Sequence, residues 1–295
     1  MQRLSKAGRI KVESYDPQGP QQFNLVRALI FAATRLDLYC RLGGVMLWRM
    51  VMKGWRARLG FLVPPGNPTV EPELIAMTPP GVSIHFSRLV ARGPAGTHQG
   101  QEERNRSQIE HIDQSAELLV MVKPDVIMVG HTATSYTLGR GAEAELLQRL
   151  HARYAIPFAT AFGSVAAALQ ALGAKRVALG TPYSPEVTLR GKAHLEAHGF
   201  EVVSHRSLDN VADIYNETPE RAYQLGRLVD TPTAQAVFLS GTGMPTISIL
   251  DALEQDLGKP AVSANSAMMW HALRLAGLRQ CVSGYGRLLA TASNP

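Results

Sequence analysis

Residues 126–139 read VIMVGHTATSYTLG, four apolar residues followed at once by a turn of glycine, histidine and small hydroxyl residues. The apolar run has the length of a buried strand, and a helical pattern follows the turn. The same unit occurs as GFLVPPGNPTVEPE at 60–73, VALGTPYSPEVT at 177–188 and AVFLSGTGMPTIS at 236–248. Strands that alternate with helices in this way predict βαβ units and parallel sheets.

The alternation continues from residue 56 to the end of the chain. Short apolar runs predict strands at 59–63, 82–86, 126–129, 157–160, 177–180, 201–204, 236–240 and 261–263. Helical patterns fall near 103–122, 141–153, 164–173, 185–198, 218–229, 245–257 and 266–276. Because βαβ crossovers are right-handed, open doubly wound sheets are the expected arrangement. The pattern runs twice, so we expect an α/β fold of two pseudo-symmetric, doubly wound lobes with mostly parallel sheets.

The expected boundaries divide the chain into four parts. Residues 56–156 form the first α/β lobe and residues 157–280 the second. Residues 281–295 form a C-terminal segment, and one alternative is that this segment returns to the first lobe. Residues 1–55 form an N-terminal extension, disordered or loosely helical, that is not part of the working enzyme. A transit peptide, a membrane-surface helix and a packing arm are the alternatives for this extension.

The formal charge is concentrated in the N-terminal extension. The 295 residues include 30 Lys and Arg against 24 Asp and Glu, a net charge of +6. Residues 1–55 hold nine of the basic residues and three of the acidic ones, so the rest of the chain is neutral overall. A neutral body lacks the basic surface of a nucleic-acid-binding protein, and we predict no nucleic-acid partner.

Composition excludes several further classes of protein. Two cysteines, Cys40 and Cys281, are too few for a disulfide framework or for a cysteine-ligated zinc or iron–sulfur site. Charges interrupt every apolar run before it reaches about 18 residues, so we predict no membrane span. With few cysteines and no export signal, the cytoplasm is the default location. Homo-oligomerisation stays open.

The turns after four predicted strands carry the candidate site. They are residues 64–69, 130–136, 181–184 and 241–246, rich in Gly, Ser, Thr, Asn and Tyr. Ligands of open α/β sheets bind at the carboxyl ends of the strands, where free N–H groups and hydroxyls hold an oxyanion. Simple helix capping is the alternative for any one turn. No dinucleotide or P-loop motif and no metal-ligand spacing occurs, so we predict no cofactor and no metal.

These motifs together resemble the Asp/Glu racemase superfamily, and within it the branch of maleate cis-trans isomerases and arylmalonate decarboxylases. The resemblance covers about residues 57–290. It also rests on GKPAVSANSAMMWHALRLAG at 258–277 and GYGRLL at 284–289. It implies two facing lobes with the active site in the cleft between them, and cofactor-independent chemistry next to a carboxylate.

The chain departs from this family at its catalytic positions. The family's racemases and isomerases use two opposed cysteines, one from each lobe, and its decarboxylases keep only the second. Here His131 stands at the first cysteine position, and Gly241, followed by Thr242, stands at the second. Cys281 matches neither position. The resemblance therefore assigns His131, Gly241 and Thr242 to the catalytic positions but excludes catalysis by the family's thiolates.

The substrate-binding positions carry over more fully. The resemblance implies that Asn67 contacts a substrate carboxylate and that Tyr183 faces the cleft from the other lobe. It implies that the turn containing Thr132, Ser135 and Tyr136 forms an oxyanion pocket. Asn265 lies in the turn after the last strand and completes the expected set.

We expect an enzyme of the lyase or isomerase type whose substrate is a small carboxylate or dicarboxylate. Decarboxylation or cis-trans isomerisation would pass through an enolate-like intermediate, which a single preorganised donor stabilises by roughly 3–4 kcal/mol. His131 would move the proton in place of a thiol, because its unperturbed pKa lies near neutrality. A structural role for His131, a hydrolase, and a carboxylate-binding protein without turnover are the alternatives.

Overall fold

The computed structural model describes residues 54–92 and 100–291. The predictions for the N-terminal extension therefore fall almost entirely outside the described residues. Within the described ranges, none of the helices has both the length and the apolar character that crossing a membrane requires.

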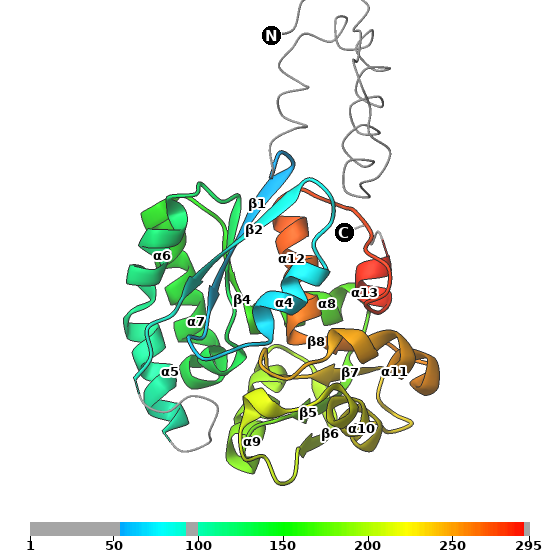
Figure 1. Cartoon of the computed structure of the whole chain (residues 1–295). Coiled ribbons are helices and arrows are strands. Elements are labelled where there is room, and N and C mark those ends of the chain that lie inside the picture. Colours follow the sequence, from blue (N-terminus) through cyan, green and yellow to red (C-terminus); the bar gives the residue numbers. More distant parts are fainter. Residues whose placement is uncertain (1–53, 93–99, 292–295) are drawn as a thin grey trace, which may run out of the picture. The chain divides into compact units, whose positions relative to one another are not determined.

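Two four-stranded parallel sheets organise the described chain (Figure 1). The first has the strand order β2–β1–β3–β4 and the second the order β6–β5–β7–β8. The strands of the first sheet are β1 (Ala57–Val63), β2 (Val82–Arg88), β3 (Val126–Val129) and β4 (Phe158–Thr160). Those of the second are β5 (Arg176–Thr181), β6 (Glu201–Ser207), β7 (Ala236–Leu239) and β8 (Ala261–Ser263). The predicted α/β fold with two pseudo-symmetric lobes is confirmed, and all eight predicted strands are present.

Helices connect consecutive strands in both lobes. They are α4 (Val70–Ala76), α5 (Gln101–Glu110), α6 (Ile112–Val120), α7 (Thr132–Tyr154), α8 (Ala161–Ala171), α9 (Pro185–Ala197), α10 (Pro219–Val229), α11 (Leu250–Leu257), α12 (Ala264–Leu275) and α13 (Arg287–Ala290). Two 3₁₀ turns, η1 (Ile214–Asn216) and η2 (Ile247–Ile249), lie in the second lobe. Hydroxyl side chains define several helix starts, since Thr160, Ser184, Thr218 and Ser263 accept hydrogen bonds from the first turns of α8, α9, α10 and α12.

The strand order places the candidate turns together. In each sheet the chain leaves the first strand to one side and returns on its other side, so the order reverses between β1 and β3, and again between β5 and β7. The carboxyl ends of strands flanking such a switch point border a crevice. The turns after these four strands are the ones that the sequence singled out.

One continuous hydrophobic core joins the two lobes. It contains residues of both sheets, including Phe61, Met128 and Phe238, together with the buried faces of α8 and α12. These two helices lie side by side (Figure 1). Burial of this shared apolar surface holds the lobes in fixed register, which the site between them requires.

Some element boundaries differ from those predicted. β4 pairs with β3, so the first sheet extends to Thr160, past the lobe boundary expected at residue 156. The single helix expected over 103–122 is two helices, because the backbone at His111 leaves the helical region. α7 begins at Thr132, before the expected residue 141, and is interrupted at Gly139, where φ is 73°. In the C-terminal segment, the Tyr285 hydroxyl donates to the carbonyl of Ala76, the last residue of α4 in the first lobe.

A buried carboxylate also links the lobes. Glu73 of α4 is 8% exposed and accepts hydrogen bonds from the backbone N–H groups of Thr246 (2.6 Å) and Ile247 (3.0 Å) and from Nδ2 of Asn265 (2.6 Å). Burial raises the pKa of Glu73, and these hydrogen bonds partly offset the rise. One side chain of the first lobe thereby satisfies three donors of the second.

Removing this carboxylate should destabilise the protein strongly. Glu73→Ala leaves the buried N–H groups of Thr246 and Ile247 without partners and removes one of the two hydrogen bonds of Asn265, at a cost of about 3 kcal/mol or more of unfolding free energy. Glu73→Gln keeps an oxygen that can accept from the two backbone N–H groups, so its loss should be smaller. Glu71→Ala, on the same helix, removes only a surface ion pair with Arg88 and should cost less than about 1 kcal/mol. Chemical denaturation of the three variants tests this ranking; equal losses for Glu73→Ala and Glu71→Ala would contradict the role of Glu73.

Candidate functional site

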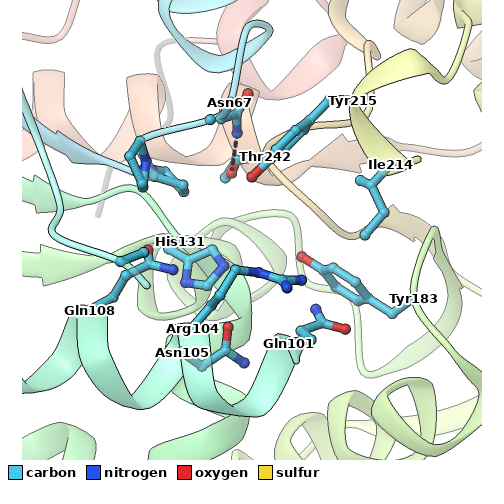
Figure 2. A pocket seen from close by; sticks show the side chains of 15 residues that line it. Asn67, Gln101, Arg104, Asn105, Gln108, His131, Tyr183, Ile214, Tyr215 and Thr242 are labelled. Carbon is cyan, nitrogen blue, oxygen red and sulfur yellow. Dashed lines mark hydrogen bonds between the residues drawn. The ribbon is translucent and has the colours of Figure 1, made fainter. Parts of the chain in front are cut away.

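A pocket opens where the strand-end turns of both lobes meet α5 and η1 (Figure 2). Four predicted site residues lie in its wall, and each comes from a different turn: Asn67, His131, Tyr183 and Thr242. The other lining residues are Pro64, Pro65, Gly66, Ala91, Gln101, Arg104, Asn105, Gln108, Ile214, Tyr215 and Gly243. The wall contains one guanidinium, one imidazole, four side-chain amides and two phenols. No carboxylate or thiol is among these described lining residues.

The turns are tied to one another across the pocket. Nδ2 of Asn67 donates to Oγ1 of Thr242 at 3.1 Å (Figure 2). Oγ1 of Thr242 donates in turn to the carbonyl of Gly130 (3.2 Å). Oδ1 of Asn67 accepts from the backbone N–H groups of Thr69 and Val70 at the start of α4. Asn67 therefore holds its own turn together and also joins it to the second lobe.

Helix α5 supplies a polar face that the sequence did not reveal. Gln101, Arg104, Asn105 and Gln108 follow the i, i+3, i+4, i+7 spacing of one helix face, and all four are buried. Burial lowers the pKa of Arg104, but a guanidinium stays protonated at physiological pH. In the sequence, these residues show only the spacing of a polar helix face, and such a face is usually exposed to solvent.

His131 stands at the end of β3, between this helix and the opposite turns. Its Nδ1 lies 2.9 Å from Oγ1 of Thr134, which leaves Nε2 as the ring nitrogen free to meet a ligand. Burial and, to a smaller extent, the positive charge of Arg104 lower the pKa of His131 to about 4. The imidazole of the free protein is therefore neutral at pH 7.

Two phenols face His131 and Arg104. Figure 2 shows the hydroxyl ends of Tyr183 and Tyr215 directed into the space beside the Arg104 guanidinium. Burial raises the pKa of both tyrosines, so both remain protonated donors. Gly243 permits the position of Tyr215, because a Cβ there would lie 2.7 Å from the Tyr215 ring.

Four of the expected residues are not among those that line the pocket, and three of them have hydrogen-bond partners elsewhere. Ser135 donates to Oε1 of Glu143 (2.6 Å), and the Tyr136 hydroxyl lies 2.9 Å from that of Ser240. Thr132 is fully buried in the first turn of α7. Asn265 donates to Glu73 and to the carbonyl of Thr242 (3.1 Å). Because α7 begins at Thr132, the side chains of Ser135 and Tyr136 lie in the first turns of this helix and are hydrogen-bonded to Glu143 and Ser240.

Of the two expected thiol positions, only the one that His131 occupies carries a side chain able to transfer a proton. Gly241 has φ +98°, and a Cβ at this position would lie 2.9 Å from Pro182. Cys281 is exposed and does not line the pocket. In the second lobe, the hydroxyl of Thr242 is the nearest equivalent, and it is already hydrogen-bonded to the first lobe.

A possible set of metal ligands lies outside this pocket, among residues to which the sequence analysis assigned no metal site. Glu143, His194 and His198 each offer one ligand atom, and these atoms all lie within 4.8 Å of one another. The i, i+4 spacing of the two histidines was the signal in the sequence. Glu143 lies on another helix, so no spacing reveals it.

Known proteins are similar to this chain in sequence over most of its length. A family model described as arylmalonate decarboxylase matches residues 59–289. A maleate isomerase of Nocardia farcinica is 30% identical over 242 residues, covering 79% of this chain and 95% of that protein. An arylmalonate decarboxylase of Bordetella bronchiseptica is 28% identical over 239 residues, covering 78% and 95%.

Solved structures of maleate isomerases are also similar to this chain in fold. A maleate isomerase variant of Pseudomonas putida S16, crystallised with maleate, has a TM-score of 0.72 and 27% identity, covering 79% of this chain and 97% of its own. A Nocardia farcinica maleate cis-trans isomerase mutant carries a covalently bound succinylcysteine intermediate. It has a TM-score of 0.70 and 27% identity, covering 79% and 98%.

The pKa of His131 should respond to Arg104. Arg104→Gln removes a nearby positive charge, so the pKa should rise from about 4 towards the ordinary value of 6.5. Arg106→Gln, on the exposed side of the same helix, should leave it unchanged. A pH titration of the histidine ring signals by NMR measures both, with His131→Gln used to assign the resonance.

The same titration has a consequence for stability. Because the folded-state pKa of His131 is lowered, the unfolded chain binds more protons between about pH 4 and 6.5. The contribution of His131 to stability is present above this range and is lost as the pH falls through it. A His131 pKa that is near 6.5 in the wild-type protein would contradict its neutral, buried environment.

Proposed function

Because the chain belongs to the arylmalonate decarboxylase family, we propose that it decarboxylates a small malonate-type dicarboxylate, using only its own side chains. The observation that carries the proposal is the composition of the pocket wall. It presents one guanidinium, one imidazole and many neutral donors, and its described residues include no acid and no thiol. A small dianion is the ligand that this set of charges and donors complements.

Binding rests on the two sides of the pocket. Arg104, with the amides of Gln101 and Asn105 on the same helix face, would hold one carboxylate by charge-assisted hydrogen bonds. Tyr183 and Tyr215 would donate to oxygens on the opposite side, where negative charge grows as the substrate reacts.

The reaction needs one bond to break and one proton to move. Cleavage of the bond between the α-carbon and one carboxylate releases CO₂, and its electron pair is delocalised into the remaining carboxylate as an enediolate. The α-carbon then takes a proton from His131, which regains one from water. A bound dianion beside His131 raises the pKa of its imidazole from the low value of the free protein, so the ring becomes protonated when substrate is present.

A pocket wall whose described residues include no sulfur is less suited to isomerisation through a covalent sulfur adduct than to decarboxylation, which needs only a proton donor. The Nocardia farcinica isomerase mutant carries a succinylcysteine, a covalent adduct of sulfur. The resemblance matches His131 and Gly241 of this chain to the family's cysteine positions, and neither residue offers a thiol. An imidazole can deliver a proton to an enediolate without forming such an adduct.

His131→Gln should abolish turnover and retain binding. We expect CO₂ release from phenylmalonate or methylmalonate to fall by about 100-fold or more, because the proton donor is lost. Dissociation constants from calorimetry should change only a few-fold. In D₂O the wild-type product should carry deuterium at the α-carbon. His151→Gln, an exposed histidine on α7, serves as the control.

Each other outcome has a defined meaning. An unchanged rate in His131→Gln would refute the assigned role. Dicarboxylate binding by the wild-type protein without CO₂ release would favour a binding protein, and conversion of maleate to fumarate would favour an isomerase.

Arg104→Met should act on affinity. We expect dicarboxylate binding to weaken by about 10- to 100-fold, the loss of a charge-assisted hydrogen bond. Monocarboxylate analogues should be affected less than dicarboxylates if both carboxylates are bound. Arg106→Met on the same helix is the matched control, since its side chain is 75% exposed. Equal affinity in the two variants would rule out Arg104 as the carboxylate site.

A further inference from the structure

Helices α7 and α9 bring three metal-binding side chains together across the two lobes. Glu143 comes from α7, which follows β3 of the first lobe, and His194 and His198 lie one turn apart at the end of α9 in the second. Nε2 of His194 is 3.0 Å from Oε2 of Glu143, and the three ligand atoms all lie within 4.8 Å of one another. We propose that this cluster, hereafter the α7–α9 cluster, binds a zinc-class transition-metal ion.

The spacing of the ligand atoms suits such an ion. Two ligands about 2.0–2.1 Å from a tetrahedral zinc ion lie roughly 3.3 Å from each other. The Glu143–His194 pair is already near this separation, and His198 needs only a small closing movement. Two histidines and a carboxylate leave one coordination position for water.

The surrounding hydrogen bonds orient the ligands. Ser135 and Thr160 both donate to Oε1 of Glu143, which leaves Oε2 facing the histidines. Nδ1 of His198 donates to the backbone carbonyl of His194 (2.9 Å), so Nε2 of His198 carries the lone pair. Metal ligands in proteins are held by outer hydrogen bonds of this kind.

Packing and access complete the site. The Phe162 ring contacts both histidines, with centroid distances of 4.3 Å to His194 and 5.1 Å to His198. His194 and Glu143 are buried, whereas His198 is half-buried and gives solvent access. Imidazole ligands favour zinc, copper, nickel and iron(II) over calcium and magnesium, which prefer oxygen. Bound metal would connect the lobes at a point separate from the pocket.

The full chain, freed of metal by chelation, tests the proposal. Titration with ZnCl₂ in a calorimeter should give one site per chain that His198→Ala weakens by more than about tenfold. CoCl₂ should give the visible absorption of a low-coordinate cobalt site in the wild-type protein and not in His198→Ala. His205→Ala, an exposed histidine on β6, should bind both metals like the wild type.

Thermal unfolding supplies an independent readout. ZnCl₂ should raise the melting temperature of the wild type and of His205→Ala, and should not raise that of His198→Ala. His198→Gln, which keeps a polar side chain, provides a second variant if the alanine variant does not fold. The proposal is overturned if the folded wild type binds no zinc, or if it binds zinc equally well after His198 is replaced. In that case the cluster is a hydrogen-bonded carboxylate–histidine pair only.

Discussion

The buried carboxylate of Glu73 is the interaction on which the rest of the site depends. A carboxylate in an apolar core is unfavourable unless donors surround it, and its donors here all belong to the other lobe. Asn265, held by Glu73, donates in turn to the carbonyl of Thr242, and Thr242 bonds Asn67 and Gly130. The turns of both lobes are therefore fixed relative to each other through one connected set of hydrogen bonds. The pocket therefore stands on a frame of hydrogen bonds between the turns of the two lobes.

Sequence alone predicted the framework well because it depends on local signals. Short apolar runs bounded by Gly and Pro mark strands, and all eight were found; the family and the type of enzyme were also predicted correctly from motifs. The site was predicted only in part. Asn67, His131, Tyr183 and Thr242 line the pocket because they sit directly at strand ends at the two switch points.

What the sequence could not predict depends on tertiary burial. Arg104 and its neighbours on α5 have the pattern of an exposed face, and only the packing of α5 over the turns buries them. Ser135 and Tyr136 look like pocket residues in the sequence, but the early start of α7 directs them to Glu143 and Ser240. The α7–α9 cluster also forms only through tertiary packing, because Glu143 and His194 lie 51 residues apart in the sequence and on different lobes.

Electrostatics links substrate binding to the state of His131. The guanidinium that would attract a dianion also disfavours protonation of the imidazole beside it, so the free pocket carries a single positive charge and a neutral ring. A bound dianion would raise the pKa of His131, because its two negative charges outweigh the single positive charge of Arg104 at a similar distance. Proton uptake by His131 would then accompany binding, and the acid needed to protonate an enediolate would form only when a substrate is in place. His131 also lies close to the α7–α9 cluster along the chain. It is the N-cap residue of α7, and Ser135 in the first turn of that helix donates a hydrogen bond to Glu143 of the cluster.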